Sequence, residues 1–170
     1  MATDYEQFYR ENPNGLGEPT REFVEFFEAY EPSNATVLDI GCGQGRDALF
    51  IARLGHIVHG VDLSRTGIAD LLRAARDEEL SITADVADIR DYAWRGPYDV
   101  ILIDRTLHML QTDTRYAVLK SILAIATQGT HVLIADERSN IPGFHEVLDR
   151  DALNWTVIKR ERGYLFVVGC

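Results

Sequence analysis

Two spacings of apolar residues recur along the chain, one typical of amphipathic helices and one typical of buried strands. Phe23, Phe26, Phe27 and Tyr30 fall at positions i, i+3, i+4 and i+7, so they share one helix face. Continuous apolar runs such as 100–103 instead predict strands that are buried on both sides. Together the two spacings predict strands over 36–40, 57–61, 80–84, 99–103 and 130–135, a helix after Thr20, and helices over 47–54, 64–75 and 113–126.

The C-terminal end of the chain follows a different pattern. Residues 155–161 and 164–168 are both predicted strands, and only Arg162 and Gly163 separate them. A connection this short cannot make a parallel crossover, so the two strands must form an antiparallel hairpin. The earlier strands alternate with helices, which favours right-handed βαβ units and a parallel sheet. The sequence therefore predicts an α/β protein whose parallel sheet ends in a hairpin, with no room for a large insertion before Trp155.

A glycine-rich loop follows the first predicted strand. Gly41, Gly43 and Gly45 give the spacing G-x-G-x-G between that strand and its helix, where free backbone N–H groups can face a ligand. The dinucleotide fingerprint requires a glycine at position 46, where this chain has Arg46. The spacing thus argues against a nicotinamide cofactor.

Aspartates stand at or near the carboxyl ends of all five strands of the alternating region. Ligands of open α/β sheets bind along that edge, and a row of carboxylates suits a cationic ligand better than a pyrophosphate. Asp62 is placed to accept hydrogen bonds from ribose hydroxyls, and Asp85 from an adenine amino group. Two of these aspartates could instead serve only as helix caps, namely Asp104 and Asp136. The full set is Asp39, Asp62, Asp85, Asp104 and Asp136.

Four segments together resemble the class I S-adenosylmethionine-dependent methyltransferases. Residues 37–46 are similar to the family's first motif, 60–64 to its second, 84–86 to its third and 98–110 to its fourth, and the terminal hairpin matches its antiparallel last strand. The resemblance implies a three-layer, Rossmann-like fold with a seven-stranded, mostly parallel sheet in the order 3-2-1-4-5-7-6, formed by a single domain over 1–170. Within the family, the chain looks most like the small tellurite-resistance and thiol methyltransferase branch.

The same resemblance implies S-adenosylmethionine as the cofactor and assigns residues to its parts. Asp39 and the loop would hold the methionine end, Asp62 the ribose, and Asp85 with Val86 the adenine edge. Leu63 would pack on the adenine, and Asp104 with Arg105 would lie beside the transferring methyl. The predicted cofactor-binding residues are Asp39, Gly41, Cys42, Gly43, Gly45, Arg46, Asp62, Leu63, Asp85, Val86 and Asp104.

Three residues are candidates for the catalytic step. His108 follows the fourth strand and is the best candidate for a base, although it could simply pack in a turn. Arg105, like Arg138, could bind an anionic acceptor or neutralise an adjacent acid. Tyr9 belongs to an N-terminal arm, residues 1–19, which we expect to cover the donor as a lid with Tyr5 and Leu16, or else merely to pack on the sheet.

The leading functional hypothesis is in-line methyl transfer to a small soft or anionic acceptor, such as a thiol or a chalcogen oxyanion. A soft nucleophile needs no strong base, whereas an oxygen or nitrogen acceptor usually does. The alternatives are a small-molecule O- or N-methyltransferase that uses His108, and a non-catalytic donor-binding module that a partner completes. The Asn-Pro-Pro-Tyr signature of nucleic-acid amino methyltransferases is absent from the fourth motif.

Composition narrows the expected partners and location. The formal net charge of −10 argues against a nucleic-acid partner, because such binding rests on neutralising phosphates. Cys42 and Cys170 are the only cysteines and indicate no metal cluster, so no metal is expected. No apolar run approaches the roughly 20 residues of a membrane span, and no secretory signal stands at the N-terminus. We therefore expect a cytoplasmic monomer or homodimer that acts on a small molecule, away from membranes.

Overall fold

The computed structural model describes residues 4–13, 15 and 17–170. The chain divides into two compact units, Met1–Asp88 and Ile89–Cys170, which are described one after the other. The seven strands have the order β3-β2-β1-β4-β5-β7-β6, which confirms the order predicted from the sequence.

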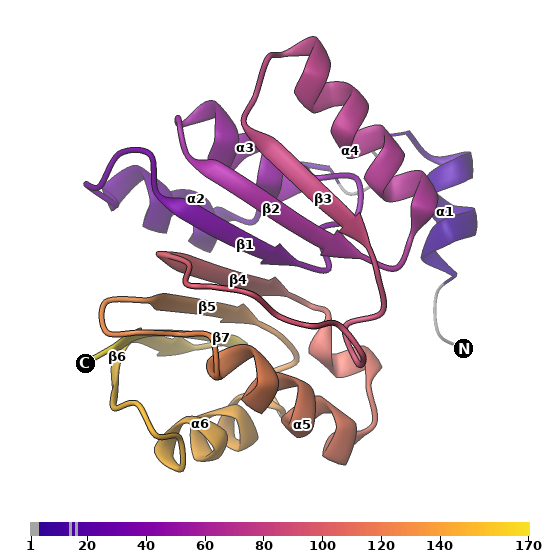
Figure 1. Ribbon diagram of the computed structural model, residues 1–170. Coiled ribbons are helices and arrows are strands. Elements are labelled where there is room, and N and C mark those ends of the chain that lie inside the picture. Colours follow the sequence, from indigo (N-terminus) through magenta and orange to yellow (C-terminus); the bar gives the residue numbers. More distant parts are fainter. Residues whose placement is uncertain (1–3, 14, 16) are drawn as a thin grey trace. The chain divides into compact units, whose positions relative to one another are not determined.

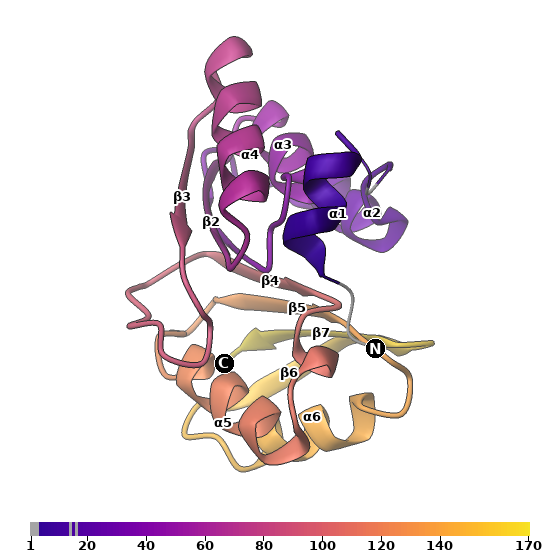
Figure 2. The ribbon, with the colours of Figure 1, turned by 90° about the vertical axis from the view of Figure 1, so that its right-hand side faces the viewer.

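The first unit builds three parallel strands with their helices (Figure 1). β1 pairs with β2, and β2 pairs with β3. In Figure 2 the four helices of this unit lie on one side of its strands, with α1 beside α4. The elements are α1 (Tyr5–Glu11), α2 (Arg21–Ala29), β1 (Thr36–Ile40), α3 (Arg46–Arg53), β2 (Ile57–Asp62), α4 (Arg65–Asp77) and β3 (Ile82–Val86).

The second unit contains the predicted hairpin. β4 and β5 are parallel, while β7 runs antiparallel to both β5 and β6. Val100, Ile101, Leu102 and Ile103 are fully buried, as the continuous apolar run predicts. The elements are β4 (Val100–Asp104), the short 3₁₀ helix η1 (Leu107–Met109), α5 (Thr112–Leu123), β5 (His131–Ala135), α6 (Ile141–Asp149), β6 (Trp155–Glu161) and β7 (Tyr164–Gly169).

Three parts of the prediction differ from the structure. The third strand starts at Ile82 rather than at Leu80, because the Leu80 N–H donates to the carbonyl of Ala75 and closes the end of α4. Helix α6 was not predicted, although Ile141, Phe144, Val147 and Leu148 form a buried stripe of helical spacing. The stretch 87–99 between β3 and β4 contains neither helix nor strand, so this connection departs from the expected alternation.

Candidate active site

The glycine loop, residues 41–45, turns sharply between β1 and α3. Gly41, Gly43 and Gly45 have φ angles of 77°, 52° and 86°, all in the left-handed region where side chains are strained. The spacing G-x-G-x-G therefore follows from the backbone, since every second residue takes a conformation that favours glycine. Without Cβ atoms at these positions, the backbone of the loop is open to close approach by a ligand.

Asp62, the last residue of β2, holds this loop in place. Its carboxylate accepts hydrogen bonds from the N–H of Gly43 at 2.9 Å and from the N–H of Ser64 at 2.8 Å. Burial raises the pKa of Asp62, although the backbone hydrogen bonds from Ser64 and Gly43 act in the opposite direction. A carboxylate offers about four lone-pair positions, so it can position the loop and still accept hydrogen bonds from ligand hydroxyls.

Strand register brings the other predicted adenosine residues to the same edge. Asp62 lies opposite Val86 and Val61 lies opposite Asp85 in the parallel pair β2–β3. Two apolar side chains at this edge are exposed, with Leu63 at 69% and Val86 at 41%. Asp85 lies 3.5 Å from Nε2 of His59, a neighbour that the sequence did not reveal. The edge thus combines carboxylates with apolar surface that a flat ring can cover.

Three more predicted cofactor residues surround the loop. Asp39, at the end of β1, and Cys42 are both buried. Burial and the carboxylates of Asp39 and Asp62 raise the pKa of the Cys42 thiol, so it stays protonated at neutral pH. Arg46 points elsewhere, because its guanidinium contacts Asp47 at 2.8 Å and Thr20 at 3.0 Å. Arg46 therefore ties the start of α2 to α3.

The N-terminal arm packs on α4 and the glycine loop. Tyr9 is 4% exposed, and burial raises the pKa of its hydroxyl, which stays protonated at neutral pH. The Tyr9 ring lies beside Gly67 of α4, where an added Cβ would stand 3.0 Å from the backbone carbon of Gly43. Only glycine at position 67 lets the helix approach the loop this closely. Leu16, which we expected in the lid, lies outside the described residues.

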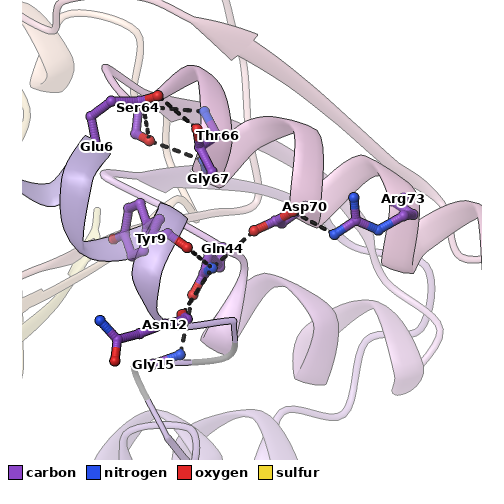
Figure 3. Close-up of polar contacts among 10 residues, drawn as sticks. All are labelled: Glu6, Tyr9, Asn12, Gly15, Gln44, Ser64, Thr66, Gly67, Asp70 and Arg73. Atoms are coloured by element: carbon purple, nitrogen blue, oxygen red, sulfur yellow. Dashed lines mark hydrogen bonds and ion pairs between the residues drawn. The ribbon is translucent and has the colours of Figure 1, made fainter.

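Two further side chains fasten the arm, and sequence reasoning missed both (Figure 3). The Glu6 carboxylate accepts hydrogen bonds from the hydroxyls of Ser64 and Thr66 and from the Thr66 N–H at 3.2 Å. The buried Gln44 side chain joins the arm to the loop and to α4. Their contacts span 26 to 60 residues along the chain, which no local motif indicates.

In the second unit, the segment after β4 forms a turn of unusual geometry. Arg105 has φ 48°, an uncommon value for a residue with a large side chain, and its N–H donates to the carbonyl of Ala135 at 2.7 Å. The side chain of Arg105 is exposed, and Asp104 before it is partly buried. His108 lies in η1, where its Nδ1 is buried and has no hydrogen-bond partner among the residues that the structure describes.

Arg115 of α5 organises this turn, and sequence reasoning missed it as well. Its guanidinium donates to the carbonyls of Leu107 at 3.0 Å, His108 at 3.0 Å and Leu110 at 2.9 Å. It also donates to Oδ1 of Asn140. On the sequence, Arg115 is one more polar residue of an amphipathic helix. Its planar fork of donors instead fixes three carbonyls of the turn that carries His108.

Asp136 takes the cap-like role that the sequence analysis had left open. It accepts hydrogen bonds from the N–H groups of His108 and Glu137 and from the amide of Asn140. The buried carboxylate thus fixes the start of η1 from β5. Two other histidines have structural surroundings, since His56 accepts from the Ala35 N–H and burial lowers the pKa of His131.

The comparisons with known proteins agree with this geometry. Residues 37–129, more than half of the chain, match the family model described as "Methyltransferase domain". The chain is 30% identical over 164 residues to the 2-heptyl-1-hydroxyquinolin-4(1H)-one methyltransferase of Mycobacteroides abscessus, which covers 89% of this chain and 72% of that protein. The chain therefore belongs to the methyltransferase domain family, and its membership of the class I S-adenosylmethionine-dependent methyltransferases is confirmed.

Two further similarities concern TehB of Haemophilus influenzae. The chain is 30% identical over 102 residues to that probable S-adenosyl-L-methionine-dependent methyltransferase, which is 60% of this chain and 36% of TehB. The crystal structure of TehB superposes with a TM-score of 0.75 and 18% identity, over 97% of this chain and 66% of that one, which shows a shared fold.

The described residues form neither a metal site nor a membrane-spanning helix. Within the described part of the chain, no group of three or more His, Cys, Asp or Glu residues is arranged to hold a metal ion. None of the described helices is long and apolar enough to cross a membrane.

Proposed function

We propose that this methyltransferase transfers the methyl group of S-adenosylmethionine to a small soft or anionic acceptor, such as a thiol or a chalcogen oxyanion. The observation that carries the acceptor class is Arg105. A large side chain at φ 48° costs on the order of 1–3 kcal/mol, and such strain is concentrated at functional sites. The strained backbone presents an exposed guanidinium at the end of β4, where it can attract an anion.

The donor residues follow from the geometry of the first unit. We define the donor cradle as Gly41, Gly43, Gly45, Asp62, Leu63, Asp85 and Val86. In the proposal, the open backbone of the glycine loop and Asp39 receive the methionine end, while Asp62 accepts from the ribose hydroxyls. Leu63 and Val86 cover the adenine, and Asp85 accepts from its amino group. Cys42 and Arg46 act indirectly, through loop packing and through the start of α3.

Methyl transfer to a soft anion needs no strong acid or base. The donor carries its methyl on a sulfonium, which is already activated. The protein therefore has to orient the acceptor and exclude water. We assign the orientation of the acceptor to Arg105 and the exclusion of water to the arm with Tyr9.

A product screen tests the acceptor class. Purified protein is given donor with an isotope-labelled methyl group and one candidate acceptor at a time. The panel holds thiols, halides, oxyanions of tellurium and selenium, small phenols and a 1-hydroxyquinolin-4-one. We expect label in a thiol or chalcogen product and at least a ten-fold loss in kcat/KM for Arg105→Gln. Transfer only to neutral acceptors, or none despite donor binding, would contradict the proposal.

A second candidate is methylation of oxygen or nitrogen on a small aromatic molecule. The Mycobacteroides abscessus relative is named as the methyltransferase of a hydroxyquinolinone. The buried Nδ1 of His108, with no partner in the described part of the chain, favours a histidine base. His108→Gln separates the two candidates, since a soft acceptor predicts a change in kcat below about three-fold and base catalysis predicts a loss of about 10²–10⁴-fold.

A further inference from the structure

Gln44 stands between Gly43 and Gly45 of the donor loop but turns its side chain away from the donor cradle. It is 6% exposed and lies against the N-terminal arm on one side and α4 on the other (Figure 3). The G-x-G-x-G pattern places no restriction on the residue type at position 44. The choice of glutamine here therefore needs an explanation in its contacts.

Both ends of the Gln44 amide are used. The amide oxygen accepts from the N–H of Gly15 at 3.2 Å. The amide nitrogen lies 3.3 Å from the carbonyl of Asn12 and 3.5 Å from that of Tyr9. It also donates to Asp70 of α4 at 2.9 Å. The amide of Gln44 thus joins the glycine loop to the arm and to α4. A carboxylate could only accept and an amine could only donate, so neither could make the same set of hydrogen bonds.

The arm has a second attachment at the other side of the loop. Glu6 reaches the N-terminal turn of α4 through Ser64 and Thr66, beside Asp62. Its negative charge is close enough to Asp62 to contribute to the raised pKa of that carboxyl. Tyr9, between the two attachments, packs where α4 meets the loop. The docked arm therefore contacts the neighbours of both partners of the Gly43–Asp62 hydrogen bond, namely Gln44 beside Gly43 and Ser64 near Asp62.

We propose that Gln44 is a positioning residue that couples donor binding to docking of the N-terminal arm. The inference rests on the proposed donor role of the glycine loop. A donor that orders the loop also orders the Gln44 amide, and this favours the docked arm. By linkage, the docked arm raises donor affinity by the same factor. The glycine loop then binds the donor through its backbone and holds the N-terminal arm over it through the Gln44 side chain.

Limited trypsin cleavage after Arg10 measures arm docking directly, because Arg10 lies on the exposed face of α1 in the full chain. In the wild-type protein we expect saturating S-adenosylmethionine to slow this cleavage about ten-fold, the size of a typical coupling. Gln44→Glu keeps the shape and the acceptor but places a carboxylate against Asp70. We expect it to reduce the protection by donor to less than two-fold and to weaken calorimetric donor affinity about ten-fold.

Gln7→Glu is the matched control. Gln7 lies on the exposed face of α1 and donates to Glu11 at 2.9 Å. The substitution therefore makes the same chemical change within the arm but away from the glycine loop. It should leave both readouts at wild-type values. Gln44→Leu provides a second variant without the added charge, and circular dichroism checks that each variant is folded.

A cycle with Glu6→Ala separates coupling from simple loop damage. If Gln44 acts through the arm, releasing the arm by Glu6→Ala removes most of the effect of Gln44→Glu on donor affinity. Equal losses from Gln44→Glu in both backgrounds, or unchanged protection in Gln44→Glu, would overturn the coupling. Failure of the wild-type protein to bind the donor at all would instead overturn the proposed function.

Discussion

The donor cradle of the first unit and the turn after β4 in the second unit are built by different means. In the proposed cradle, the surface offered to the donor is backbone that left-handed glycines leave open, fixed by the partly buried carboxylate of Asp62. In the turn, a side chain from another helix, Arg115, fixes the backbone carbonyls around His108. The contact that fixes the glycine loop lies within one strand–helix–strand segment, since Gly43 and Asp62 are 19 residues apart. The turn combines Arg115, which is 5 to 8 residues from the carbonyls it contacts, with Asp136, which is 28 residues from His108.

This difference separates two tasks of the enzyme. A donor common to the whole family suits a cradle of backbone atoms and a few fixed carboxylates. An acceptor that varies between relatives suits a turn whose side chains can change while Arg115 and Asp136 keep its path. The comparison predicts that variants in the cradle change donor affinity, whereas variants around the turn change turnover.

Asp62→Asn is expected to have the largest effect. The amide has only one acceptor oxygen for the N–H groups of Gly43 and Ser64, so the loop loses a hydrogen bond and the ribose loses its carboxylate. Hydrogen bonds to charged groups contribute about 1.5–3 kcal/mol each, which predicts at least a roughly 100-fold loss of donor affinity by calorimetry. Asp77→Asn, on the exposed end of α4, is the control. Wild-type donor affinity in Asp62→Asn would show that this carboxylate takes no part in donor binding.

The cradle could be predicted from the sequence because its chemistry is local. Gly41, Gly43 and Gly45 follow a strand at a fixed spacing, and Asp62 ends the next strand, so the pattern alone brings them together. The terminal hairpin was predictable for the same reason, since the two-residue connection permits only one pairing of the last two strands. The order of all seven strands was implied by the family resemblance instead.

The rest depended on packing that periodicity does not encode. Gln44 and Glu6 make contacts to residues 26 to 60 positions away, and their residue types give no hint of the partner. Arg115 has the spacing of an exposed helix residue but lies partly buried. Leu80 has the apolarity of a strand residue but ends a helix instead, because a backbone hydrogen bond to Ala75 outweighs its propensity.

Arg115→Lys tests the other side of the comparison and is expected to have an intermediate effect. Lysine keeps the charge but lacks the planar fork that reaches three carbonyls at once. We expect kcat to fall about ten- to hundred-fold, because small misplacements of reacting groups cost up to about that much, while the donor dissociation constant stays unchanged. Arg150→Lys, at the exposed residue that follows α6, is the control. A parallel loss of donor affinity would show that the two tasks are not separate.

Glu6→Gln sharpens the comparison at the arm and is expected to have the smallest effect of the three substitutions. Hydrogen bonds from Ser64 and Thr66 lower the pKa of Glu6 to about 2, below the ordinary value of about 4.3. A lowered carboxyl pKa contributes stability that is complete above the ordinary value and is lost as the pH falls toward about 2. In that window, the free energy of unfolding should therefore fall less steeply in Glu6→Gln than in the wild-type protein.

Denaturant titrations at a series of pH values measure this difference. Glu25→Gln is the matched control, because Glu25 is an exposed acid paired with Arg21 on α2 and has no contact with α4 among the described hydrogen bonds. Its pH dependence should follow the wild-type curve. Identical slopes for Glu6→Gln and the wild-type protein would mean that the arm is released without cost when Glu6 is protonated. The attachment beside Asp62 would then contribute nothing to the cradle.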